Sequence, residues 1–178
     1  NFFVHVTDIL VAALDTHMDL QSGHARRVAQ LSNRIGRELG LDEARRQRLH
    51  FAALLHDVGM LRIDPQRMNE QRIARQHPML GHRMLAPIQL WQEVAPLVLH
   101  HHEWFDGNGY PEQLVGDAIP LESRIILFTV LTVLALAVGS LVEAIPMFFD
   151  KSNVKEIASV KPYTPLEVLG RDIYLREG

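Results

Sequence analysis

Residues 100–111 read HHHEWFDGNGYP, three consecutive histidines followed by a segment rich in glycine and aspartate. Adjacent imidazolium rings repel each other, whereas neutral imidazole is the commonest side-chain ligand of metals. We therefore interpret this run as part of a metal site. The pair His56-Asp57 lies upstream of it, and His77-Pro78 lies between the two. Histidines combined with a carboxylate favour one or two divalent metals of hard or borderline character.

The spacing of apolar residues predicts a helix over residues 22–39. Its apolar face consists of Val28, Leu31, Ile35 and Leu39. His24 lies on the same face, near the beginning of the helix, where an inward-pointing ligand is expected. A structural histidine bonded to a carbonyl at the edge of the core is the alternative for His24.

Two further helices carry histidines of the pattern. One is predicted to begin at the capping residue Asp42 and to run to Met60, with His56 facing inward. The other is predicted over residues 88–102, with His101 on its apolar side. These positions direct the histidines towards a shared interior.

The predicted fold is all-α, a helical bundle followed by one long apolar helix and a short terminal helix. Alternation of polar and apolar residues is too short anywhere for a strand. Residues 103–120 are rich in glycine, aspartate and proline, which is typical of a loop that faces a substrate. At 178 residues the chain suffices for one well-packed domain.

The composition narrows the classes of function. A net charge of −3 gives no basic surface for a nucleic-acid polymer. Cysteine is absent, which excludes disulfides, thiolate zinc sites and covalent attachment of a c-type haem. The sequence opens with neither methionine nor a signal peptide, so we expect a fragment of a longer protein.

Over about residues 8–126 the pattern resembles the HD-GYP family, bacterial metal-dependent phosphodiesterases that cleave cyclic di-GMP. The residues that carry the resemblance, in the family's order and spacing, are His24, His56-Asp57, His77-Pro78, His101-His102-Glu103, Asp106-Gly107 and Gly109-Tyr110-Pro111. The His-Asp pair alone is a weak signal, and the run from His101 to Pro111 is a specific one.

The resemblance implies hydrolysis by two divalent metals, with iron or manganese expected from the mixed imidazole and carboxylate ligands. Asp57 and His56 are the implied catalytic pair, with Asp57 bridging the metals. The implied ligands are His24 and His56 on one side and His77, His101 and His102 on the other.

The resemblance also assigns the loop that follows the histidines. Glu103 and Asp106 are expected to accept hydrogen bonds from ligand imidazoles. Gly109, Tyr110 and Pro111 are expected to form the wall of the substrate site, with Tyr110 placed to stack on the dinucleotide or to hydrogen-bond to it.

Two positions depart from the family's pattern. Met60 stands where the family has a lysine that contacts substrate phosphate, and a thioether donates no charged hydrogen bond. Val130 stands where the family has an aspartate that ligates the metal on the His24 and His56 side. We therefore expect that metal to be weakly held and the activity to be reduced or lost.

An apolar stretch begins where this pattern stops. Residues 125–142 contain no charged side chain, and after Glu143 the apolar run continues to Phe149. Ile125–Phe149 is long enough for a transmembrane helix, and a fully buried core helix is the alternative. If the stretch enters a membrane, the metal cluster is left open on one side.

From about residue 126 to 178 the sequence is similar to the membrane-anchored mono-haem subunit of bacterial cytochrome c oxidases. Residues 139–149, 160–166 and especially 170–178, GRDIYLREG, carry this resemblance. The family's haem-attachment motif follows at the point where this sequence ends, so we expect no covalent haem. A natural fusion, an assembly or frameshift artefact and a chimera all produce such a join.

The predicted organisation has three parts: a metal-binding helical domain (residues 1–124), the apolar helix (125–149) and an oxidase-subunit-like tail (150–178) with a short helix near residues 165–176. The resemblances place the amino-terminal domain in the bacterial cytoplasm, anchored in the inner membrane, in agreement with the arginines before residue 125. Three hypotheses follow: a weakened or inactive cyclic di-GMP phosphodiesterase, a still active one, and a non-catalytic membrane chain that associates with oxidase subunits.

Overall fold

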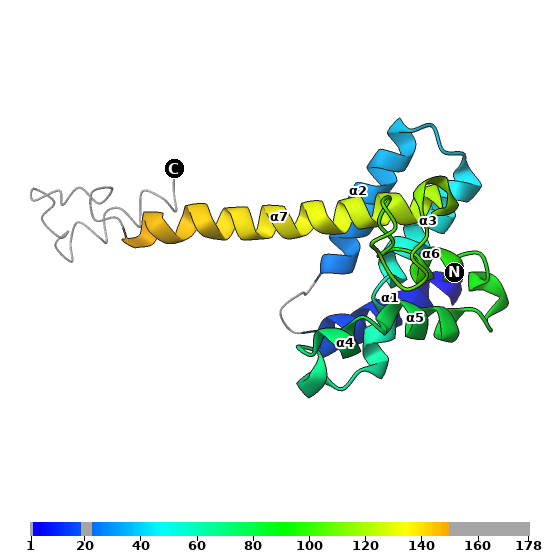
Figure 1. Cartoon of the computed structure of the whole chain (residues 1–178), viewed down its shortest axis with the longest axis horizontal. Coiled ribbons are helices and arrows are strands. Elements are labelled where there is room, and N and C mark those ends of the chain that lie inside the picture. Colours follow the sequence, from blue (N-terminus) through cyan, green and yellow to red (C-terminus); the bar gives the residue numbers. More distant parts are fainter. Residues whose placement is uncertain (1, 19–22, 150–178) are drawn as a thin grey trace, which may run out of the picture. The chain divides into compact units, whose positions relative to one another are not determined.

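The computed structural model describes residues 2–18 and 23–149, with side chains for residues 4–18 and 23–139. Every regular element in these ranges is helical, apart from one isolated bridge between Asp106 and Val115, so the all-α prediction is confirmed. The α-helices are α1 (Phe2–His17), α2 (His24–Glu38), α3 (Glu43–Leu55), α4 (Gln71–Ala74), α5 (His77–Leu85), α6 (Ala95–Leu99) and α7 (Leu121–Phe149) (Figure 1). Short 3₁₀ helices connect them: η2 (Val58–Arg62), η3 (Pro65–Arg67), η4 (Gln89–Trp91) and η5 (Gly116–Ala118).

The chain divides into two compact units, Asn1–Val138 and Gly139–Gly178. The first unit holds the helical bundle and the predicted site. In the second unit the described part is the end of α7. The predicted helix near residues 165–176 and the tail over residues 150–178 lie outside the described residues.

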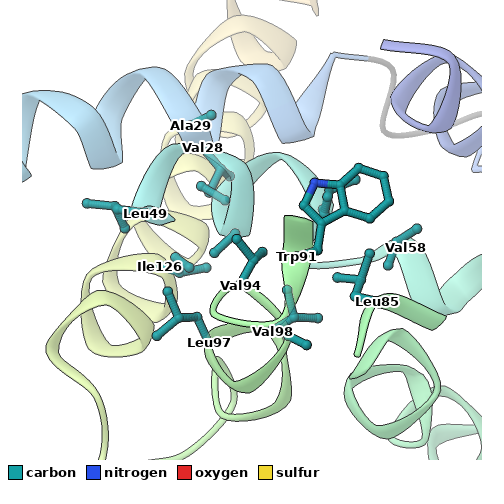
Figure 2. Close-up of a cluster of buried hydrophobic side chains, with 14 of the residues drawn as sticks. Val28, Ala29, Leu49, Val58, Leu85, Trp91, Val94, Leu97, Val98 and Ile126 are labelled. Carbon is teal, nitrogen blue, oxygen red and sulfur yellow. The ribbon is translucent and has the colours of Figure 1, made fainter. Parts of the chain in front are cut away.

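The hydrophobic core of the first unit lies where α2 packs on α3 and where α6 and the beginning of α7 close over them (Figure 2). Val28, Leu49, Val98 and Ile126, one from each of these helices, are all fully buried. Burying such a side chain contributes about 1.5–3 kcal/mol. The core therefore fixes the helices that present the histidines.

Helix α3 begins as predicted and ends earlier than predicted. Asp42 caps it by accepting a hydrogen bond from the Arg45 amide at 2.8 Å. The α-helical part ends at Leu55, and the chain then turns into η2. This turn brings the chain against α5 so closely that a Cβ on Gly59 would lie 2.0 Å from the carbonyl oxygen of His77. Only glycine permits this approach, which joins the His-Asp pair to the His77 helix.

One other predicted boundary also shifts, and one residue of a predicted apolar face is exposed. The helix predicted over residues 88–102 is reduced to η4 and α6, and Pro96 takes an early position in α6 because it has no amide hydrogen to donate. On α2, Val28 is buried as expected, whereas Leu39 is 56% exposed because it caps the carboxyl end of the helix.

Helix α7 begins inside the domain. Ile125 and Ile126 are buried, Thr129 is hydrogen-bonded to Ser32 at 2.9 Å, and Glu122 accepts from Arg45 at 2.8 Å. The first turns of α7 are therefore held in the domain by these contacts.

The apolar face of α7 becomes exposed along the helix. Phe128, Leu131, Leu134, Leu136 and Val138 are each more than half exposed. Leu121–Gly139 is long and apolar enough to cross a membrane by length and composition, with a mean hydropathy of 2.0, and it is the one such stretch among the described residues. The packed part of this stretch ends near Val133, which still contacts the core, eight residues after the predicted beginning of the membrane helix at Ile125.

Candidate metal centre

The structure brings all six predicted ligands together in two neighbouring groups. Within each group, one ligand atom per residue lies within 4.8 Å of the others. The groups are His24, His56 and Asp57, and His77, His101 and His102. They come from α2, the α3–η2 turn, α5 and the turn after α6. The histidines therefore converge although they are far apart in the sequence.

Asp57 connects the two groups through its two carboxylate oxygens. Its Oδ2 lies 3.1 Å from His56 Nε2, and its Oδ1 lies 3.2 Å from His77 Nε2. The same Oδ1 lies 4.0 Å from His101 Nε2. A carboxylate with one oxygen towards each group is the arrangement that a bridging ligand needs.

Main-chain carbonyls orient three of the ligand imidazoles. In each case Nδ1 donates to the carbonyl oxygen three residues earlier. The pairs are His56 with Ala53 at 2.8 Å, His77 with Ala74 at 2.7 Å and His101 with Val98 at 2.7 Å. A carbonyl only accepts, so Nδ1 carries the proton and the neutral ring presents a bare Nε2. This is the tautomer that binds a metal through Nε2.

The facing Nε2 atoms of His77 and His101 show that the site suits a metal. Their Nε2 atoms lie 3.2 Å apart, and both rings already donate through Nδ1. Two acceptors this close need a cation between or beside them. His101 is completely buried, and this burial lowers the pKa of its imidazole well below the ordinary value, so a proton is a poor cation there. The donor set therefore fits a metal ion.

The pKa shifts of the other predicted ligands also suit a metal site. Burial, together with the nearby His77, lowers the pKa of His102 to about 3, so this ring stays neutral and able to bind a metal. Burial alone would raise the pKa of the Asp57 carboxyl, but His56 and His77 hold it well below its ordinary range. For His56, burial lowers the pKa, and the adjacent Asp57 outweighs burial and raises it. A proton on His56 thus occupies the place that a metal would take.

A cavity of 410 Å³ opens beside the ligands. Its opposite wall is the apolar side of α7, with Leu127, Val130, Leu131 and Leu134. Val130 therefore faces the site at the position where the resemblance expects an aspartate. The first turns of α7 remain part of the domain, so they close the cluster on this side.

The loop after the histidines forms another wall of the cavity. The ring of Tyr110 stacks on His102, with 4.8 Å between ring centres and 14° between planes. The Tyr110–Pro111 peptide bond is cis. A Cβ on Gly109 would lie 2.2 Å from the Trp104 amide nitrogen, so only glycine lets this loop fold back on the histidines. Of the predicted wall residues Gly109, Tyr110 and Pro111, Tyr110 lines the cavity and stacks on a ligand.

Glu103 and Asp106 do not orient the imidazoles, which corrects the expectation for both. Glu103 is buried and accepts from the amides of Glu112 at 2.7 Å and Leu114 at 3.0 Å. Asp106 is exposed and accepts from the Asn108 amide and side chain. Both carboxylates stabilise the loop instead, because the Nδ1 protons of His56, His77 and His101 are already taken by main-chain carbonyls.

Arg75 is a residue of this site that the sequence motifs did not indicate. It lines the cavity, and its guanidinium lies 5.1 Å from the centre of the Tyr110 ring. Its position two residues before His77 is the only signal in the sequence.

A helical bundle in which two groups of imidazoles share one aspartate defines a metal-binding domain of the HD type. Residues 8–131 match the HD domain family. The chain belongs to this family. HD domains bind divalent metals, in agreement with the ligand groups described above.

Curated relatives share the domain. The cyclic di-GMP phosphodiesterase response regulator RpfG of Xanthomonas campestris is 36% identical over 59% of this chain. A cyclic di-GMP phosphodiesterase of Thermotoga maritima is 37% identical over 71% of the chain, and the 3'3'-cGAMP-specific phosphodiesterase 3 of Vibrio cholerae is 34% identical over 64%. The matches span 30%, 37% and 26% of these relatives, so the chain covers about a third of their length.

The end of the chain matches a second family. Residues 119–178 match the cytochrome c oxidase mono-haem subunit family FixO. This match overlaps the HD match over residues 119–131. Both resemblances drawn from the sequence are therefore confirmed, and the two families meet within the first part of α7.

Proposed function

We propose that this domain is a metal-dependent phosphodiesterase of weakened activity, with cyclic di-GMP as its substrate. The observation that carries the proposal is the Asp57 carboxylate, which directs one oxygen to each of two imidazole groups. The names of the relatives support the choice of substrate. A cyclic dinucleotide needs few local cations, which agrees with a net charge of −3.

Each ligand has a defined task in this proposal. Two bound metals, iron or manganese by ligand type, would lower the pKa of a shared water and clamp the scissile phosphate. His24 and His56 would hold one of them, and His77, His101 and His102 the other, with Asp57 between. Carbonyl-oriented rings keep their Nε2 atoms aimed at the metals, and the Tyr110 ring shapes the wall that meets the dinucleotide.

Two side chains support reduced activity. Met60 is 8% exposed and packs with Leu14 and Ile63, so it offers no charged donor to a phosphate. Val130 gives the His24 and His56 side an apolar neighbour in place of a carboxylate. Charge that develops in the transition state is then less well stabilised, and the metal on that side is held by fewer ligands.

The test uses the full chain in lipid nanodiscs, loaded with iron or manganese. We expect slow conversion of cyclic di-GMP to linear dinucleotide, together with metal bound in elemental analysis. The His56→Ala variant should abolish the hydrolysis. A metal-loaded chain that hydrolyses neither cyclic di-GMP nor 3'3'-cGAMP would refute the activity. Comparing the two substrates also decides between the specificities named for the relatives.

We also propose that α7 anchors the domain in a membrane. The exposed apolar side of α7 supports this, and so does the match to a mono-haem subunit family. Beyond the cavity wall, from Ala135 to Phe149, the helix rises about 22 Å, which covers most of the roughly 30 Å of a hydrocarbon core. Trp104 and Phe105 line an exposed apolar hollow with Leu131, which extends this surface beside the helix. The arginines of the domain favour the cytoplasmic side.

The alternative is a non-catalytic membrane chain that associates with oxidase subunits through its tail. The match over residues 119–178 favours this candidate. Affinity purification of the tagged chain from native membranes separates the two proposals. Recovery of oxidase subunits with a metal-free chain would support the alternative, and a metal-loaded chain that recovers none would exclude it.

A further inference from the structure

The aromatic ring of Tyr110, which stacks on the predicted ligand His102, also contacts a cation, the guanidinium of Arg75. Arg75 follows α4, and its guanidinium carbon lies 5.1 Å from the centre of the Tyr110 ring. That ring stacks on His102 at 4.8 Å. The Tyr110 ring therefore contacts both a predicted metal ligand and a guanidinium. Cation–π attraction to Tyr110 holds the guanidinium over the cavity.

The charge of Arg75 is available to a ligand. Among the described residues that line the cavity, Arg75 is the one permanent cation and Asp57 the one carboxylate. Several other arginines of the domain pair with carboxylates, as Arg45 does with Glu122 at 2.8 Å. Arg75 has no such acidic partner in the described part of the chain, and it is exposed. An anion that entered the cavity would meet this charge.

We propose that Arg75 binds a phosphate of the cyclic dinucleotide at the edge of the cavity. This inference rests on the proposed function. A guanidinium presents two parallel N–H donors that match a phosphate, and its contact with Tyr110 orients them in advance. Arg75 is exposed and contacts Tyr110, whereas the predicted ligands His77 and His101 are buried, so Arg75 lies at the outer edge of the cavity. It therefore takes the phosphate that is not being hydrolysed.

The first test measures binding. Calorimetry with cyclic di-GMP on the metal-loaded full chain should give a Kd about 10- to 100-fold weaker in the Arg75→Gln variant, as expected for a lost charged hydrogen bond. Arg72→Gln is the matched control, because Arg72 is exposed on α4, the helix that Arg75 caps, and does not line the cavity. It should bind as the wild type does, and both variants should retain the wild-type metal content.

A second readout separates a binding role from a structural one. The Arg75→Gln variant should raise KM for cyclic di-GMP and leave kcat nearly unchanged, because a contact with the distant phosphate is uniform through the reaction. Hydrolysis of bis-p-nitrophenyl phosphate, which has a single phosphodiester, should be equal in variant and wild type. Arg75→Lys should recover part of the affinity, since lysine keeps the positive charge but cannot donate two parallel hydrogen bonds.

The outcomes are distinct for the two proposals. An Arg75→Gln variant that binds cyclic di-GMP as tightly as the wild type, or that loses its metal, would overturn the role of Arg75. A wild-type chain that binds the dinucleotide without hydrolysing it would overturn the activity alone. A wild-type chain that binds none would overturn both.

Discussion

The Nε2 atoms of His77 and His101 face each other at 3.2 Å in the centre of the site. Each ring donates its Nδ1 proton to a main-chain carbonyl, so both facing atoms are acceptors. Two such acceptors repel each other at this distance unless a cation lies between them and is bound by both. The histidine cluster is therefore expected to make the stability of the fold depend on metal.

Removal of the metal tests this dependence. We expect a chelator to lower the Tm of the wild-type chain by about 5–10 °C, since a ligand present at a hundred times its Kd contributes about 2.7 kcal/mol. The measurement is thermal unfolding followed by circular dichroism, with elemental analysis before and after chelation. The His102→Ala variant should respond much less. An equal decrease in both proteins would show that the chelator acts elsewhere.

Restoring a carboxylate at Val130 should strengthen the metal on the His24 and His56 side. Val130 lines the cavity beside these ligands, so an aspartate there adds a charged oxygen to an incomplete set. We expect Val130→Asp to fill the second metal position at roughly 10- to 100-fold lower metal concentration, the range that even outer partners of a metal ligand reach. Titration with manganese and measurement of bound metal would check this.

The matched control is Leu134→Asp, which places a carboxylate on the same wall of the cavity one helical turn further along α7. It should not change the stoichiometry. If both aspartates increase metal binding equally, the effect is one of general negative charge, and position 130 has no special geometry.

The convergence of the predicted ligands could be anticipated from the sequence because their spacing is tied to helix geometry. His24, His56, His77 and His101 each follow an apolar face or mark a helix end, and the core that fixes those faces is continuous. The capping role of Asp42 was equally predictable, because a short acidic side chain just before a helix accepts a hydrogen bond from the amide of the helix's first turn.

The remaining features of the fold and the site depend on contacts that cannot be predicted from the type of side chain. Helix α3 ends at Leu55 because Gly59 meets the His77 carbonyl, a contact between segments far apart in the chain. The acceptors of the imidazole protons are main-chain carbonyls, which every residue has, so the sequence pointed to Glu103 and Asp106 instead. Arg75 was missed because a lone arginine is usually a solvated surface residue.

The two ligand groups should release metal at different pH values. Asp57 raises the pKa of His56 above its ordinary 6.5, so protons compete with metal for its Nε2 already near neutral pH. Burial lowers the pKa of His102 to about 3 and that of His101 well below 6.5, so protons compete there only in acid. As the pH falls, we expect metal on the His56 side to be lost first.

Metal content measured by equilibrium dialysis across pH 4–8 would check this order. Two separate steps are expected, and the step at higher pH should disappear in the His24→Ala variant, which weakens only that group. A single step common to the wild type and the variant would contradict the assignment, because it would mean that both metals are bound as one unit.

Trp104 offers a direct test of the membrane surface. The chain has two tryptophans; Trp91 is 3% exposed in the core, whereas Trp104 is 51% exposed beside Leu131. In a Trp91→Phe variant reconstituted in vesicles, Trp104 emission should be quenched by brominated lipids and shielded from aqueous acrylamide, as expected for an aromatic side chain at the membrane interface. Phe105→Ser should reduce the lipid quenching. Quenching by acrylamide alone would place this surface in water, and concentration-dependent shielding without lipid would identify a second copy of the chain as its partner.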